Sequence, residues 1–190
     1  MVPRESGLGA VANSEYAVSR DFCRIFAEEM DGLYTLSLLL TAEPSQAEKC
    51  FSQSLEDCLA SGRVFQGWAH SWARRAVIQN AVRIVRPAAE QRTPLMRFAQ
   101  PATGNEPGES FPLAAILNLK PFDRFAFVMS TLEQFSDQEC AVLLGCSRRE
   151  VVEARNRAIE SLAELESQAG VNAFGPATSF QPGHEAAKSA

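Results

Sequence analysis

Apolar residues recur at helical spacing along most of this chain, and stretches rich in proline and glycine separate the segments that show it. The first segment covers residues 14–40, where the apolar positions predict one helix. Pro44 suits the first turn of a second helix, which is predicted to end at about Ser61. Later in the chain a longer helix is predicted from Pro121 to Leu132. The pattern therefore predicts an all-α protein.

The stretch over residues 87–112 interrupts the helical pattern. It carries five of the chain's ten prolines and shows little periodicity, a composition typical of a linker. We therefore predict two small helical domains, over residues 15–86 and 113–166. A flexible lead-in over residues 1–14 and a disordered tail over residues 167–190 are predicted to flank them.

Two capping boxes follow each other closely in the second predicted domain. Ser136 with Glu139 forms the first, and Ser147 with Glu150 forms the second. Gly145 lies between them and is the residue best able to end a helix in the left-handed conformation. This pattern predicts two helices joined by a tight turn, a helix-turn-helix whose second helix starts at Ser147. An ordinary helical hairpin without a role in DNA binding would show the same pattern.

The charge of the chain is unevenly distributed. The whole chain has a formal net charge of −5, which argues against a protein that coats nucleic acid. Residues 63–97, however, contain seven arginines against the single acid Glu90, so 7 − 1 gives +6. Arginines interleaved with aromatic residues on one helix suit phosphate contact and base stacking. The nucleic-acid contacts predicted in this region are Arg74, Arg75, Arg83 and Arg86.

Phe65, Trp68 and Trp72 recur at i, i+3 and i+7 within the basic region. Large aromatic side chains at helical spacing are more often part of the core than of a binding surface. We therefore predict that both tryptophans are buried.

Five cysteines, at positions 23, 50, 58, 140 and 146, show no paired spacing of metal ligands. Their odd number, their helical settings and the lack of a signal peptide predict reduced thiols and a cytoplasmic location. We interpret them as small core residues, with a zinc site or a redox switch as the alternatives. No apolar run reaches the length needed to span a membrane.

Taken in order, these features resemble a bacterial RNA polymerase sigma factor of the sigma-70 family. The resemblance is to the extracytoplasmic-function group, which keeps only regions 2 and 4. Residues 139–151 fit the pattern E-x-A-x-x-L-G-x-S-x-x-x-V of region 4, and Arg157-Ala158 fits its closing Arg-Ala. Phe65-x-x-Trp68 and Ala73-Arg74 fit region 2 in order and spacing.

The resemblance implies a transcription initiation protein that binds core RNA polymerase and promoter DNA. Region 2 would bind the −10 element, and the helix-turn-helix would bind the −35 element. The implied DNA contacts in region 4 are Ser147, Arg148, Arg149, Arg155, Asn156 and Arg157. The implied polymerase contacts are Glu48, Lys49, Ser52 and Gln53. An anti-sigma protein is a further candidate partner, and no cofactor, metal, catalytic residue, small-molecule substrate or membrane attachment is expected.

Two departures from the family pattern favour a second hypothesis. Family members usually carry an acidic run where this chain has residues 49–53, Lys-Cys-Phe-Ser-Gln. Residues 137–166 contain four arginines and seven acids, so 4 − 7 gives −3, and each glutamate facing a phosphate would oppose DNA binding. The second hypothesis is a diverged sigma-like regulatory or protein-interaction module that no longer initiates transcription.

A third hypothesis, a free-standing helix-turn-helix regulator, accounts only for the second predicted domain. An enzyme is least expected, because the chain has no glycine-rich phosphate loop or nucleophile motif and only two histidines.

Overall fold

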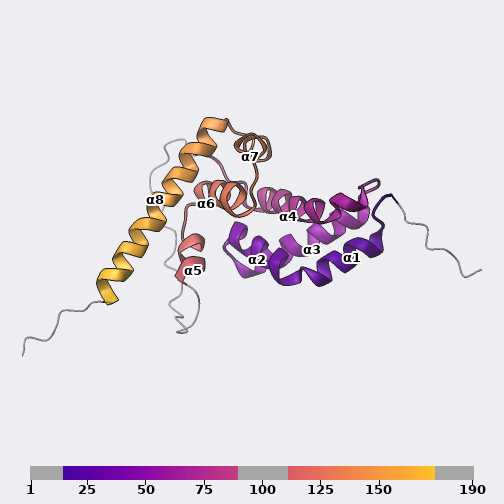
Figure 1. Ribbon diagram of the computed structural model, residues 1–190, viewed down its shortest axis with the longest axis horizontal. Coiled ribbons are helices and arrows are strands. Elements are labelled where there is room, and N and C mark those ends of the chain that lie inside the picture. The colour runs from indigo at the N-terminus through magenta and orange to yellow at the C-terminus, as the bar shows by residue number, and fades with distance from the viewer. Residues whose placement is uncertain (1–14, 90–110, 174–190) are drawn as a thin grey trace, which may run out of the picture.

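The structure, a computed structural model, describes residues 15–89 (the first half) and 111–173 (the second half), and its regular elements there are helices (Figure 1). The first half contains α1 (Ser19–Glu28), α2 (Met30–Thr41), α3 (Pro44–Ala60), the 3-10 turn η1 (Gln66–Trp68) and α4 (Ala69–Val85). The second half contains α5 (Phe111–Leu117), α6 (Pro121–Phe127), the π-helical segment η2 (Val128–Leu132), α7 (Asp137–Leu144) and α8 (Arg148–Ala173). The predicted all-α class is confirmed.

The single helix predicted over residues 14–40 is wrong, because the chain leaves the helical conformation at Glu29 and continues as α2. Glu29 has φ −104° and ψ 21°. The apolar pattern does not reveal this break. Phe26 and Leu33, both buried, lie seven residues apart, which is about two helical turns, so they stay in phase across it. The break lets α1 and α2 each pack against α3 and α4 in a four-helix unit.

Both capping boxes predicted from the sequence are formed. The Ser136 amide donates to Glu139 Oε2 at 2.9 Å, and the Ser147 amide donates to Glu150 Oε2 at 2.8 Å. Gly145 ends α7 with φ 66° and ψ 34°, in the left-handed region. Local hydrogen bonds thus fix the start of α7, the turn and the start of α8, while the DNA-binding role of these helices stays a prediction.

One helix start agrees with the sequence pattern and one helix end lies beyond the predicted one. α7 begins at Asp137, directly after Ser136, where the predicted capping box provides partners for the first amides. α8 continues to Ala173, into the segment predicted as a disordered tail. The lead-in over residues 1–14, residues 90–110 of the predicted linker and residues 174–190 of the predicted tail lie outside the described residues.

The two halves pack against each other (Figure 1), and buried side chains from both form one apolar core. α2 contacts α5 and α6, and α4 contacts α7. Leu40 and Ile78 from the first half and Phe125 and Met129 from the second half are all fully buried in this core. The predicted domain boundaries are not tested by this packing, but the described halves form one unit rather than two separated bodies.

Gly145→Ala is expected to destabilise the protein by about 1 kcal/mol, because an L residue in the left-handed region crowds its own backbone. A Cβ added there meets no other atom within 4 Å, so the loss comes from the backbone alone. Urea unfolding of both proteins measures it. Gly62→Ala is the matched control, since its added Cβ also meets nothing within 4 Å and its φ is ordinary. Equal stability of the two variants would contradict the interpretation.

Candidate functional site

The start of α8 presents the first three predicted DNA contacts at the surface, close to acidic side chains. The Ser147 hydroxyl donates to Glu150 Oε2 at 2.7 Å, so it serves the capping box. Arg149 is 87% exposed, and its Nε lies 2.7 Å from Glu153 Oε1. Arg148 is 70% exposed and lies 3.9 Å from Asp137. These side chains can reach a ligand, but carboxylates of the same surface already compete for two of them.

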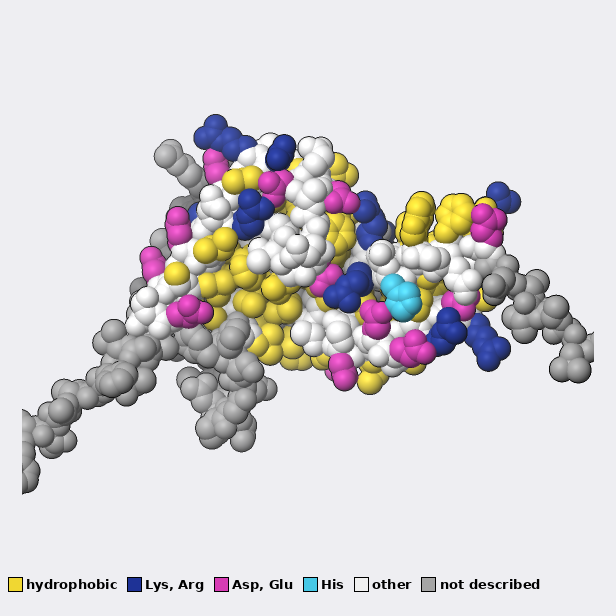
Figure 2. Space-filling model, viewed as in Figure 1, with side chains coloured by type: hydrophobic (Ala, Val, Ile, Leu, Met, Phe, Trp, Pro, Cys, Tyr) yellow, Lys and Arg dark blue, Asp and Glu magenta, His cyan; other side chains and the backbone are white. Residues whose placement is uncertain are grey.

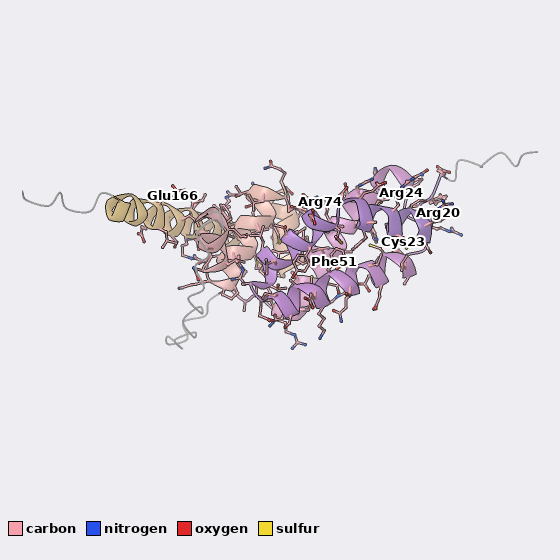
Figure 3. All side chains as sticks on the ribbon, turned by 90° about the horizontal axis from the view of Figure 1, so that it is seen from below. Arg20, Cys23, Arg24, Phe51, Arg74 and Glu166 are labelled. Atoms are coloured by element: carbon pink, nitrogen blue, oxygen red, sulfur yellow. The ribbon has the colours of Figure 1, made fainter. Side chains whose placement is uncertain are left out.

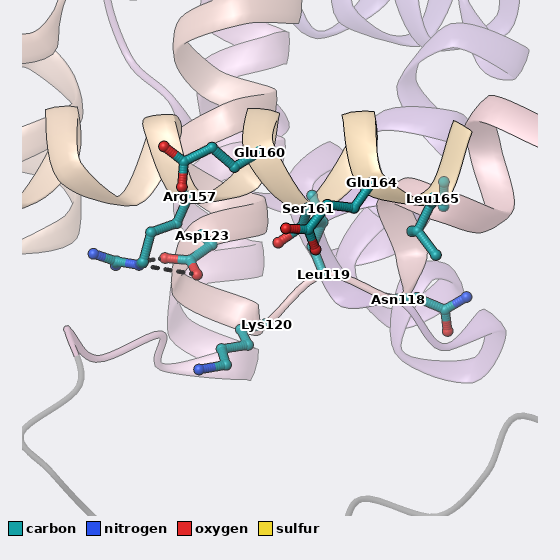
Figure 4. A pocket seen from close by; sticks show the side chains of 10 residues that line it. Asn118, Leu119, Lys120, Asp123, Arg157, Glu160, Ser161, Glu164 and Leu165 are labelled. Carbon is teal, nitrogen blue, oxygen red and sulfur yellow. Dashed lines mark hydrogen bonds and ion pairs between the residues drawn. The ribbon is translucent and has the colours of Figure 1, made fainter. Parts of the chain in front are cut away.

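Two of the next three predicted contacts on α8 form ion pairs with acids of neighbouring helices. Arg155 forms an ion pair with Asp137 of α7. Arg157 Nη2 lies 2.6 Å from Asp123 Oδ1 of α6 (Figure 4). Asn156, between them, is exposed. Arg155 and Arg157 therefore hold α8 against α7 and α6.

The arginines predicted on α4 differ in their surroundings. Arg74 forms two hydrogen bonds with Glu133, Nε to Oε2 at 2.7 Å and Nη2 to Oε1 at 2.8 Å. Its Nη1 also lies 3.5 Å from Glu29 Oε2. The hydrogen bond to Glu133 is the main cause of the raised pKa of Arg74. Arg83 pairs with Asp57 of α3 at 2.9 Å.

Arg75 and Arg86 complete the predicted set on α4. Arg75 is partly buried. The pKa of the Glu139 carboxyl is lowered, mainly by the Ser136 hydroxyl and amide and in addition by Arg75. Arg86 is exposed and ends α4 in the left-handed region with φ 50°. Among the arginines that the structure describes on α4, Arg86 thus projects beyond the end of the helix.

Both tryptophans are at the surface, so the prediction that they are buried is wrong. Trp68 is 66% exposed and Trp72 is 42% exposed. Ala69 and Ala73, each one position later, occupy the inward face of α4 and are buried, and one position corresponds to about 100° of rotation around a helix. The spacing gave the period of the helix correctly, but small residues rather than the tryptophans face the core.

The exposed tryptophans lie near the start of α4, where Trp68 belongs to a small aromatic cluster with Phe65 and Tyr16, and Trp72 follows one helical turn later. Phe65 stacks on Tyr16 with ring centroids 4.9 Å apart, and Trp68 meets Phe65 edge-on at 5.3 Å. Trp72 Nε1 donates to Ser61 Oγ at 3.1 Å. Hydrophobic side chains protrude from this end of the molecule beside charged ones (Figure 2). The cluster is a surface on which a base or a partner side chain can stack.

The predicted polymerase contacts lie together on α3. Glu48, Lys49 and Ser52 are exposed and Gln53 is partly buried, while Cys50 on the same helix faces the core. The acidic character that the family pattern leads one to expect is missing from this face, because Glu48 and Lys49 are neighbours of opposite charge.

Three of the five cysteines are buried, as small core residues would be: Cys50, Cys58 and Cys140. Burial raises the pKa of Cys58 to about 12 and that of Cys140 to about 11, so both thiols stay protonated at neutral pH. Cys23 is exposed and Cys146 is partly buried. Across residues 15–89 and 111–173, no group of three or more metal-ligating side chains comes together.

The pairing of α4 with acids of the second half is the feature that the sequence does not reveal. Arg74 and Glu133 lie 59 positions apart, and neither belongs to a sequence motif from which its partner could be predicted.

No helix among those that the structure describes is both long and apolar enough to cross a membrane.

Part of the second half matches a known protein-family model. The family model described as the sigma-like domain of the response regulator PhyR matches residues 116–168. The matched residues extend from the end of α5 into α8 and include both capping boxes. A search of the curated proteins finds no match. Together with the helical structure, the family-model match supports an extracytoplasmic-function sigma-like fold and a sigma-like regulatory character for this chain.

Proposed function

We propose that this chain is a sigma-like regulatory module that acts by binding a protein partner, an anti-sigma protein, and does not itself open promoters. The observation that carries the proposal is that several of the predicted DNA-contacting arginines are already paired with carboxylates. Arg74, Arg155 and Arg157 are each held by a carboxylate of another helix of the same chain. A phosphate would have to displace these carboxylates before it could bind.

The electrostatics of the candidate recognition helix support the same proposal. Affinity for DNA comes largely from Lys and Arg side chains that neutralise phosphates, and each nearby carboxylate weakens this electrostatic attraction. In α8, Glu150 and Glu153 lie among the arginines of the first turns. Binding a protein partner does not require a uniformly positive surface, because interfaces between proteins combine both signs of charge with apolar contacts. The family model matched by the second half is, by its description, that of a response regulator.

Transcription initiation is the second candidate function, and one observation favours it. Trp68 and Trp72 are exposed near the start of α4, and stacking on aromatic side chains is a common way to bind unpaired bases. Under this alternative, core RNA polymerase would bind α3, and opened promoter DNA would lie along α4.

The expected result is that the purified protein does not co-migrate with bacterial core RNA polymerase on a sizing column, but forms a one-to-one complex with an anti-sigma protein. An authentic sigma factor of the extracytoplasmic-function group serves as the positive control. The Lys49→Asp/Gln53→Glu variant restores acidic side chains on α3 and should gain polymerase binding if that face decides the outcome. Co-migration of the unmodified protein, with promoter-dependent transcripts, would instead establish initiation.

A further inference from the structure

Two glutamates of the second half, Glu133 and Glu139, lie beside Arg74 of α4. Glu133 follows η2 and holds Arg74 through two parallel hydrogen bonds, the strongest geometry available to a guanidinium and a carboxylate. The side chain of Glu133 is 9% exposed and that of Arg74 is 38% exposed, so solvent screens this pair in part. Arg75, the neighbour of Arg74, adds to the lowering of the pKa of the Glu139 carboxyl on α7, after the larger effects of the Ser136 hydroxyl and amide.

Arg74, Glu133 and Glu139 line a groove at the junction of the two halves. The groove has a volume of about 210 Å³ and is lined by Ser71, Arg74, Glu133, Gln134, Phe135 and Glu139. Arg74 lies near the middle of the molecule, where the halves meet, and not at either end (Figure 3). Cationic, acidic and histidine side chains gather in the same central region of the surface (Figure 2). The two glutamates thus approach α4 from the second half at a small groove.

The backbone that carries Glu133 is irregular on both sides. Before it, η2 is π-helical, a form that is rare and often occurs at functional sites. After it, Gln134 has φ 59°, a left-handed conformation that residues other than glycine rarely adopt. A segment of this kind keeps its shape only when its surroundings hold it, and the ion pair with Arg74 is one of the contacts that hold it.

Arg74 and Arg75 are also two of the four arginines that the sequence predicts as nucleic-acid contacts in this region. A carboxylate and a phosphate present similar oxygen atoms to a guanidinium, so one can take the place of the other. We propose that Glu133 and Glu139 form an autoinhibitory cover: the second half occupies, with its own carboxylates, the positions on α4 where the phosphates of a nucleic acid bind. Removing the cover exposes a basic surface next to the aromatic cluster.

The test uses full-length protein, a fluorescein-labelled oligothymidine as the probe, and anisotropy measured over a range of salt concentrations. The cover variant is Glu133→Gln/Glu139→Gln, in which glutamine keeps the shape of each side chain and can still complete the capping box at Ser136. The matched control is Glu160→Gln/Glu164→Gln on α8. It removes the same two charges, and among the described residues neither Glu160 nor Glu164 has an ion-pair partner (Figure 4).

The cover variant is expected to bind oligothymidine roughly tenfold more tightly than the parent protein at low salt. The slope of log K against log salt should become steeper by about 1.4, which corresponds to two more phosphates neutralised on a single strand. The control variant should show only the smaller gain that follows from its changed net charge. Adding Arg74→Gln to the cover variant should remove at least half of the gain in slope.

Equal binding by the cover and control variants, including no binding by either, would overturn the proposal. If the cover variant has a lower melting temperature than the parent protein, Glu139→Gln alone is measured, with Glu160→Gln as its control. About half of the change in slope is then expected. The proposal concerns nucleic acid and goes beyond the partner-binding function. The polymerase and anti-sigma assays can therefore fail or succeed independently of this one.

Discussion

Phe125→Ala is expected to destabilise the protein by about 3–5 kcal/mol and to unfold both halves together. Phe125 is fully buried in α6, in the core that α6 shares with α2. Removing the ring leaves a cavity at the point where the halves meet, and the surrounding helices can close it only partly. Because the core is continuous, the loss of stability should extend to the first half.

Urea unfolding followed by two signals measures this effect. Both tryptophans of the chain, Trp68 and Trp72, lie in the first half, so their fluorescence reports on that half, while circular dichroism reports on all helices. The two signals are expected to shift to lower urea by the same amount. A fluorescence transition unchanged from the parent protein would show that the halves unfold independently, as two linked domains would.

Arg124→Ala is expected to destabilise the protein by about 2–4 kcal/mol, as the net of two opposing effects. Arg124 is only 4% exposed and has no carboxylate partner among the described residues. It donates instead to three carbonyls: Leu119 O at 2.9 Å, Leu40 O at 3.2 Å and Leu117 O at 3.3 Å. Burial lowers its pKa to about 10 because burial penalises the charged form. Loss of the side chain would leave the buried carbonyls of Leu119 and Leu40 and the partly buried carbonyl of Leu117 without this donor.

Two further variants separate these effects. Arg124→Met fills much of the same volume without any donor, so its difference from Arg124→Ala reports packing alone. Arg148→Ala is the surface control, since Arg148 is 70% exposed, and its stability should stay within about 0.5 kcal/mol of the parent. If Arg124→Met were more stable than the parent protein, the cost of burying the guanidinium would exceed the value of its hydrogen bonds.

Arg124 also matters for how the two halves are arranged. The carbonyl of Leu40 belongs to the last turn of α2, whose final carbonyls lack partners within the helix. By donating to it, Arg124 ties α2 to the start of α6 at a buried point. Arg74 and Glu133 tie α4 to the second half at a partly exposed point. The buried contact of Arg124 suits permanent attachment of the two halves. The partly exposed contact of Arg74 with Glu133 can be exchanged for a ligand.

The sequence by itself determined those features that depend on neighbours within a few positions. The capping boxes at Ser136 and Ser147 and the left-handed Gly145 were predicted because all of their partners lie within one helical turn. The all-α class followed in the same way from apolar spacing. The family resemblance also rests on this short-range pattern, and the family-model match lies in the same part of the chain.

Only the tertiary structure decided which way each helix faces and which charges meet. The rotation of α4 about its axis turns Ala69 and Ala73 inward and leaves Trp68 and Trp72 outside, and periodicity alone does not say which stripe is buried. Arg74 pairs with Glu133, 59 positions away, and Arg157 pairs with Asp123, 34 positions away. Such pairs depend on how rigid helices pack, because one side chain reaches another only after the shared core has fixed the position of both.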